Sequence, residues 1–375
     1  MKKLQRLFAV LGLADGGQAY ADYALNLTEG VTEISHDIHD LHMLILWICV
    51  AIGVLVYGVL IYSIIHHRKS KGVVPAQFHE NTRLEIIWTV IPFLILLAMA
   101  IPATKVMIKA YDTSGADMTV KVTGYQWKWK YDYLDEGISF FSSLDAKSNE
   151  ARQLGATLSP ASVDHYLLNV DHPLVIPVGK KIRFLFTGAD VIHSWWVPDL
   201  GWKKDTIPGF VTDGWVKVEK AGTYRGQCTE LCGRDHGFMP IVVIAKPEAD
   251  YRKWVAEQKG QGQAVAAQAK ADAVKTFTKD ELVAKGKEVY NANCAACHQA
   301  GGEGISGVFP AITGSAVANG PIEEHLRMVL KGKGTMPGFQ AQLQPADIAA
   351  VVTYQRNGLG NSKGDVVQPS AVSAN

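Results

Sequence analysis

The sequence predicts a multi-domain chain with a membrane-spanning helical hairpin, an all-β sandwich or Greek-key barrel, and a small all-α domain. The uncharged apolar runs 43–65 and 86–104 are each long enough to cross a bilayer, for which about 20 residues suffice. Between residues 119 and 244, short β-branched runs alternate with Gly, Pro and Asp, as in all-β domains. From residue 278 onward the apolar pattern becomes helical.

The composition argues against a nucleic-acid partner. The 375 residues carry a formal net charge of +1, which gives no electrostatic support for binding nucleic acid. A chain of this length has room for about two or three domains, so the three predicted modules are reasonable.

Charge asymmetry orients the hairpin. Residues 22–42 contain five carboxylates and no Lys or Arg, whereas the loop between the two spans contains Arg68, Lys69, Lys71 and Arg83. Positive residues favour the cytoplasmic side, so both flanks of the hairpin are expected outside. Residues 1–21 have a basic start, a short apolar run and small residues at Ala19 and Ala21, as a cleavable signal peptide has. Residues 22–110 then form the outer N-terminal segment and the hairpin.

The β domain is expected over residues 111–250. Its clearest element is "GYQWKWKYDY", residues 124–133, in which aromatic and polar side chains alternate strictly. This period of two predicts one continuous strand with an aromatic face. The following residues 251–277 are rich in Ala, Gln and Gly, which predicts a flexible linker that allows a short helix.

The helical domain is expected over residues 278–360. It starts at a capping box, in which Thr278 precedes Glu281 by three residues. A second helix is expected to begin at Pro345 and end before Gly358. Residues 361–375 are small and polar, so we expect a disordered tail.

The stretch "CAACH" gives this helical domain its chemistry. Cys294, Cys297 and His298 match the C-x-x-C-H pattern for covalent attachment of c-type haem, with the histidine as an axial iron ligand. Met336, in "GTMPGF", is the candidate second axial ligand. A short CxxC also occurs in redox and zinc sites, but the external compartment, the preceding helix and the downstream methionine favour haem.

The loop "GQCTELCGRDHGFMP" places Cys228, Cys232, His236 and Met239 within a few residues of one another. A disulfide would need only the thiols, and a structural zinc site has little use for a thioether. Soft thiolate and thioether ligands with imidazole favour copper. Adding His193, from "VIHSWWVP", gives more ligands than one blue-copper ion takes, so two copper ions bridged by sulfur fit better.

These motifs together resemble a known family. "HSWWVPDLGWKKDTIPG" and "GQCTELCGRDHGFMPIV", following a helical hairpin and "GYQWKW", resemble subunit II of haem-copper cytochrome c oxidases. The "CAACH" domain resembles the cytochrome c fused to that subunit in bacterial caa3-type oxidases. The resemblance implies a cupredoxin-like Greek-key barrel, a cytochrome c domain with covalent haem c, and a binuclear copper centre (CuA). For this copper centre the resemblance implies Cys228 and Cys232 as bridging ligands, together with His193, His236, Met239 and the Glu230 carbonyl.

The resemblance implies roles for three further groups. The Glu230 side chain would help to hold a magnesium ion at the boundary with subunit I. Trp127 would admit electrons to the copper centre, although an aromatic residue in a strand can also be plain core. Glu85 would stand at the cytoplasmic mouth of a proton channel, although a carboxylate at a membrane end can also simply face the interface.

The implied function is electron transfer within a respiratory enzyme. An external c-type cytochrome would reduce haem c, the electron would pass to CuA, and subunit I would use it to reduce oxygen and pump protons. The implied setting is a bacterial inner membrane, with subunit I and subunit III as partners and the copper and haem domains on the periplasmic side. Lys203 and Lys204 depart from the family's usual acidic docking surface.

Two other functions remain to be weighed against this one. A free-standing membrane-anchored copper and haem carrier would use the hairpin only as an anchor. A quinol oxidase subunit would receive electrons from within the membrane and would need neither a copper pair nor haem c.

Overall fold

The computed structural model describes residues 26–77, 79–153, 155–334 and 336–373. The predicted signal peptide, residues 1–21, lies outside the described residues. The chain divides into two compact units, one built mainly from residues up to 103 and the other from residues 31–34 together with the chain from 104 onward. Each unit is described separately below.

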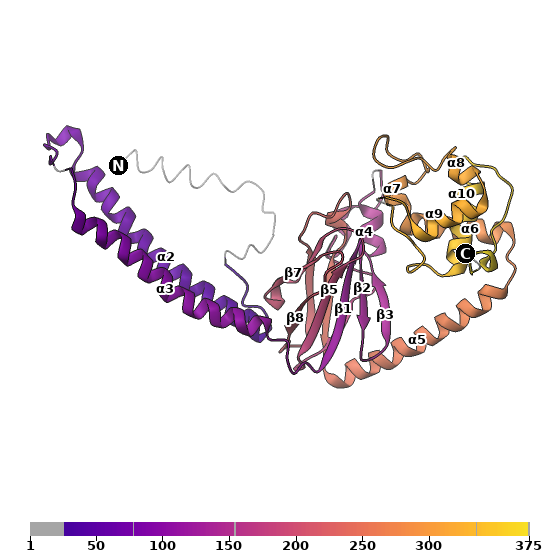
Figure 1. The fold of residues 1–375 in the computed structure, drawn as a ribbon, viewed down its shortest axis with the longest axis horizontal. Helices are drawn as coiled ribbons and strands as arrows, with labels where there is room; N and C mark the ends of the chain where they lie inside the picture. Colours follow the sequence, from indigo (N-terminus) through magenta and orange to yellow (C-terminus); the bar gives the residue numbers. More distant parts are fainter. Residues whose placement is uncertain (1–25, 78, 154, 335, 374–375) are drawn as a thin grey trace. The chain divides into compact units, whose positions relative to one another are not determined.

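The first unit contains most of two long helices, α2 (Glu33–His66) and α3 (Thr82–Tyr111), joined by a loop with the short helix η1 (Lys69–Lys71) (Figure 1). Both helices are long and apolar enough to cross a membrane. They contain the predicted spans 43–65 and 86–104 and extend beyond them at both ends. The added turns are more polar, so composition marks the apolar segment but not the helix ends.

The second unit begins with an all-β domain made of two five-stranded sheets. One sheet has the strand order β3-β2-β1-β5-β8 and the other β4-β10-β9-β6-β7. The strands are β1 (Met118–Tyr125), β2 (Lys128–Tyr133), β3 (Ile138–Ser142), β4 (Leu174–Pro177), β5 (Ile182–Gly188), β6 (His193–Trp196), β7 (Lys203–Thr206), β8 (Thr212–Val216), β9 (Gly222–Cys228) and β10 (Ile241–Lys246). The short helices α4 (Ala146–Ala151), η2 (Pro160–Ser162), η3 (Pro198–Leu200) and η4 (His236–Phe238) interrupt them.

The two sheets share an aromatic core. Phe184 of β5 stacks on Trp195 of β6 with ring centroids 5.5 Å apart, and the Trp195 indole nitrogen donates to the Tyr131 hydroxyl of β2 at 3.3 Å. All three side chains are fully buried. This packing of one sheet on the other confirms the predicted cupredoxin-like all-β class.

The segment 124–133 is not one continuous strand. β1 ends at Tyr125 and β2 begins at Lys128, and these two residues pair across an antiparallel hairpin. Gln126 and Trp127 form the turn. The alternation does correspond to a strand within β2, where Trp129 and Tyr131 are buried. In the sequence, however, the same alternation of aromatic and polar residues also runs through the turn, so the sequence pattern does not reveal the turn.

The C-terminal domain is helical, as predicted. Its helices are α6 (Lys279–Asn293), α7 (Ala295–His298), α8 (Ala316–Asn319), α9 (Ile322–Lys331), α10 (Pro345–Asn357) and α11 (Pro369–Ser373). The Thr278 hydroxyl and the Glu281 side chain form the expected reciprocal capping box. The core gathers around α10, of which ten residues are buried.

Two predictions about the flanks of this domain differ from the structure. Residues 251–277 are not a flexible linker, because α5 (Glu248–Val274) is one unbroken helix (Figure 1). Its first turns dock on the β domain, where Trp254 packs against Tyr133 at 5.3 Å between ring centroids. The described part of the predicted disordered tail is also ordered, since Val367 and Val372 belong to the buried core.

Candidate metal centre and haem-attachment site

The β strands bring the candidate copper ligands together. His193 is the first residue of β6 and Cys228 the last of β9, and these strands are antiparallel neighbours with Trp195 opposite Cys228. Gly226 permits this pairing, because a Cβ there would collide with the Trp196 carbonyl oxygen. The loop after β9 then folds back, so that Cys232 returns to the same place.

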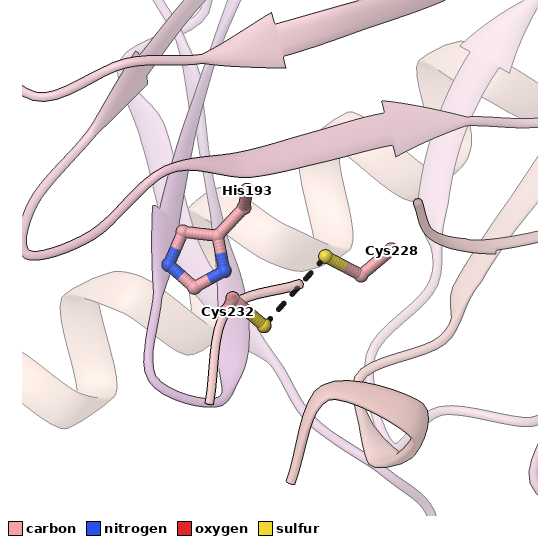
Figure 2. A group of neighbouring side chains, drawn as sticks. All are labelled: His193, Cys228 and Cys232. Carbon is pink, nitrogen blue, oxygen red and sulfur yellow. Dashed lines mark hydrogen bonds between the residues drawn. The ribbon is translucent and has the colours of Figure 1, made fainter. Parts of the chain in front are cut away.

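Five side chains and one carbonyl converge at the end of these strands. The Sγ atoms of Cys228 and Cys232 are 3.8 Å apart, and Figure 2 shows the His193 imidazole beside them. The ligand atoms of these three residues all lie within 4.8 Å of one another, and all three are buried. His236 Nδ1 and Met239 Sδ are each 3.5 Å from Cys232 Sγ, while the Glu230 carbonyl oxygen is 3.4 Å from Cys228 Sγ.

The two thiols are free and well placed to share a ligand. Their separation exceeds the sulfur–sulfur bond length of about 2.05 Å, so they form no disulfide. The hydrogen bond between the two sulfurs lowers the pKa of Cys228, with further help from His193. The same contact raises the pKa of the Cys232 thiol. The contact between the two sulfurs therefore favours one thiolate within the pair.

The histidine His193 has one nitrogen engaged and one open. Its Nε2 lies 2.9 Å from the Asp190 carboxylate, which fixes the proton on that nitrogen. Its Nδ1 is completely buried and has no hydrogen-bond partner among the described residues. Burial opposes a charge on the ring, but the nearby Asp190 carboxylate and Cys228 sulfur outweigh it and raise the pKa of His193. Because Asp190 holds the ring proton on Nε2, the lone pair of Nδ1 stays free, which is what a metal-ligating imidazole needs.

Side chains from the β1–β2 hairpin hold the loop from the other side. Gln126 Nε2 and the Trp127 indole nitrogen both donate to the Cys232 carbonyl, at 2.9 and 3.1 Å. Trp129, from β2, donates its indole nitrogen to the Met239 carbonyl at 3.2 Å. Trp127 thus touches the loop directly, because it occupies the turn and not the middle of a strand.

The remaining predicted residues lie elsewhere. The Glu230 side chain is partly exposed at the surface of the metal loop, and Glu85 is exposed in the first turn of α3. Lys203 lies 3.4 Å from Asp205, and Lys204 covers the Tyr111 ring at 4.1 Å. Both lysines therefore have partners within this chain.

The haem-attachment motif spans α7 and the residue before it. Cys294 is buried, Cys297 is partly buried, and both are free thiols. His298 Nδ1 lies 2.7 Å from the Pro310 carbonyl oxygen, so this nitrogen donates its proton and leaves Nε2 free for an axial bond. Met336 is partly buried against the domain core.

Sequence reasoning missed Asp190 and Gln126. Asp190 lies three residues before His193 in "ADVIH", and a carboxylate so close to a candidate ligand histidine is a signal that could have identified it. Gln126 gave no such signal, because its contact with the loop depends on the turn.

Comparisons with known proteins agree with this geometry. Residues 118–246 match the family "Cytochrome C oxidase subunit II, periplasmic domain", and residues 21–106 match the corresponding transmembrane domain. A probable cytochrome c oxidase subunit 2 from Rickettsia bellii is 42% identical over 226 residues, which cover 60% of this chain and 80% of the relative. The chain belongs to the cytochrome c oxidase subunit 2 family.

Further relatives extend the comparison. The cytochrome c oxidase subunit 2 of Cereibacter sphaeroides is 38% identical over 235 residues, covering 60% of this chain and 78% of the relative. The crystal structure of the periplasmic domain of subunit II (CoxB) from Bradyrhizobium japonicum covers 40% of this chain and 98% of its own, at 39% identity and a TM-score of 0.35. Residues 281–354 match the family "Cytochrome C oxidase, cbb3-type, subunit III".

As a family member, the chain is a membrane-anchored subunit of a haem-copper oxidase complex, with a cytochrome c-type domain at its C-terminus.

Proposed function

We propose that this chain is the electron-entry subunit of a bacterial oxidase, with a binuclear CuA centre and a covalent haem c. The observation that carries the proposal is the convergence of two free thiols, two imidazoles, a thioether and a carbonyl at the end of β6 and β9. When bound, haem c and CuA supply one-electron carriers between an external c-type cytochrome and subunit I, where oxygen reduction drives proton pumping.

The donor set suits two copper ions better than one. Cys228 and Cys232 each offer a sulfur with more than one lone pair, and their 3.8 Å separation allows both to bridge after a small adjustment. His193 and His236 approach the sulfurs from different elements, β6 and η4, so each can serve a different ion. Met239 and the Glu230 carbonyl complete the set as weaker ligands. Asp190 orients His193, and Trp127 and Gln126 fix the Cys232 backbone.

The helical domain supplies candidate groups for the attachment of haem c. Cys294 and Cys297 would form the thioether bonds, and His298 is held in the tautomer that leaves Nε2 for iron. Met336 would be the opposite axial ligand, which favours a high haem potential. A redox CxxC would not need a histidine oriented by a backbone carbonyl.

Other roles follow from position. Trp127 would carry electrons into the copper centre, since its indole donates directly to the Cys232 carbonyl. Glu85, exposed at the start of α3, would stand at the cytoplasmic entrance to a proton path in subunit I. The Glu230 side chain would contribute to a magnesium site shared with subunit I. We place the chain in the bacterial inner membrane, with subunit III as an additional partner and both cofactor domains outside.

Electron spin resonance of the copper-loaded chain tests the proposal. One unpaired electron shared by two coppers should give a hyperfine pattern from two equivalent nuclei. Cys228→Ser should lose copper or keep a single ion, because a hard hydroxyl replaces a bridging thiolate. Met239→Leu should retain the pair with an altered potential, because only a weak ligand is lost.

The haem domain provides the internal control. Cys228→Ser should bind haem c like the unmodified chain, since Cys294, Cys297 and His298 lie in a separate domain, whose core includes Cys294. A disulfide between Cys228 and Cys232, with no copper after expression in copper-rich medium, would contradict the copper assignment.

A further inference from the structure

Arg152 contacts the metal loop although it lies far from it in the sequence. It follows α4, in the excursion between β3 and β4. Its Nη2 lies 3.0 Å from Asp235 Oδ2, and its guanidinium carbon lies 4.3 Å from the centre of the Phe238 ring. Asp235 directly precedes His236, and Phe238 directly precedes Met239. One side chain therefore holds the neighbours of two proposed copper ligands.

The guanidinium is itself held in place. Arg152 Nε donates to Asn149 Oδ1 at 2.8 Å, one turn earlier in the chain. Asn149 belongs to α4, whose first turn is fixed by the Asp145 carboxylate accepting from the Ser148 backbone at 3.0 Å. A planar guanidinium with one edge on Asn149, another on Asp235 and its face on Phe238 has little freedom to move.

Because the Arg152–Asp235 contact is largely buried, it restricts the conformations that the metal loop can adopt. Asp235 is only 6% exposed, and the Arg152 side chain is 18% exposed. A buried ion pair adds little net stability compared with an apolar pair of the same size, because both charges lose water. Its contribution is that few arrangements of the loop satisfy both charges.

We propose that Arg152 is a positioning residue for the copper site, acting through Asp235 and Phe238 on the turn that carries His236 and Met239. This inference rests on the proposed copper function. By fixing the turn, Arg152 keeps the His236 imidazole and the Met239 thioether at their common 3.5 Å distance from Cys232 Sγ. Without it, the turn between Gly233 and Gly237 loses its link to α4.

The test compares copper release from variants of the full-length, detergent-solubilised chain. Arg152→Ala should lose copper to a chelator about tenfold faster or more, as removal of an outer-shell partner does in other metal sites. It should also distort the two-copper hyperfine pattern. The matched control is Arg183→Ala, which removes the Arg183–Asp213 ion pair of 2.8 Å in the same domain. This control should release copper at the unmodified rate.

A double variant separates positioning from stability. Arg152→Ala leaves Asp235 buried and unpaired, which by itself lowers the melting temperature. Asp235→Asn in the same chain removes that charge, so the melting temperature should recover while copper release stays fast. Unchanged copper release in Arg152→Ala, or full recovery of slow release in the double variant, would overturn the inference. An unmodified chain that binds no copper pair would instead refute the proposed function beneath it.

Discussion

At the scale of single residues, the space around His193 is as important as its hydrogen bonds. Gly124 of β1 faces the ring, and a Cβ there would lie 2.7 Å from His193 Cδ2 and 2.8 Å from the Thr206 hydroxyl. Real Cβ contacts are not this short, so the imidazole or its strand must move. The ring is fully buried and tied to Asp190, and therefore has little room to do so.

Gly124→Ala should consequently weaken copper binding about tenfold or more, as other displacements of a ligand's support do. Overpacking should also lower the free energy of unfolding by about 1–3 kcal/mol. Competition with a chelator of known copper affinity measures the first effect, and denaturant unfolding the second.

Gly222→Ala is the matched control within the same domain. A Cβ at Gly222 would meet only the end of the Tyr224 side chain, at 3.1 Å. It should leave copper affinity unchanged. Equal affinity in Gly124→Ala would show that the His193 ring has more freedom than its packing indicates.

The proposed copper ligands could be found from sequence because they are nearly contiguous. Cys228, Cys232, His236 and Met239 lie in one loop, and only His193 comes from elsewhere. The groups that orient them could not be predicted in this way. Arg152 and Gln126 reach the loop through an excursion and a turn, and no local pattern records such contacts.

At the scale of elements, the C-terminal segment stabilises the haem domain. Arg356 in α10 is 2% exposed and forms an ion pair with Asp365 at 2.6 Å. It also donates to the carbonyls of Ala318 and Gly320. The Thr353 hydroxyl is hydrogen-bonded to the Val367 backbone. Polar side chains of α10 thus fasten the segment that follows it.

Asp365→Asn should lower the free energy of unfolding of the haem domain by about 2 kcal/mol at pH 7, the scale of a hydrogen bond to a charged group. The hydrogen bond from Arg356 holds the pKa of Asp365 below its ordinary value of 3.8. A lowered pKa in the folded state stabilises the protein above the unfolded-state pKa. The difference between Asp365→Asn and the unmodified chain should therefore be complete above pH 3.8 and shrink as the pH falls below it.

Urea unfolding of the full chain, followed by haem absorbance at several pH values, measures this difference. Lys285→Ala is the control, because it removes a partly exposed ion pair with Asp347 and should cost about 0.5 kcal/mol. A difference between the Asp365 variant and the unmodified chain that does not shrink at all as the pH falls below 3.8 would show that the carboxylate acts by packing and not by charge.

Composition gave a wrong prediction for the two segments that flank the helical domain, the expected linker and the expected disordered tail, and the physical reasons differ. The segment 361–373 is small and polar, yet Val367 and Val372 suffice to bury it against α10. Residues 251–277 look like a linker because Gln and Gly are frequent. However, their alanines favour a helix, and Tyr251 and Val255 anchor its start on the β domain. In contrast, the capping box and Pro345 marked helix starts correctly, because these signals are local.

At the scale of the whole molecule, an oxidase subunit and a free-standing carrier differ in the role of the hairpin. The hairpin of an oxidase subunit packs against partner helices, whereas that of a carrier is only an anchor. The apolar side chains of α2 and α3 are exposed, including Trp47, Trp88 and Phe93. Pro92 and Pro102 lie inside α3, and prolines in spanning helices favour packing against neighbouring helices.

Membranes solubilised in mild detergent should therefore yield this chain together with haem absorbance beyond that of its own haem c. Cys228→Ser is an informative control, since it keeps the hairpin intact and should copurify in the same way. A chain that elutes alone, carrying only haem c, would favour the free-standing carrier.

The ordered C-terminal segment also affects when the haem domain can finish folding. A protein is synthesised and exported from its N-terminus, so Cys294, Cys297 and His298 emerge well before Val367 and Val372. The core that surrounds Cys294 includes both of these valines. On the proposed function, the attachment cysteines would reach the outer side while their domain is still open, and translation order alone would give haem an interval to enter before the last residues close the fold.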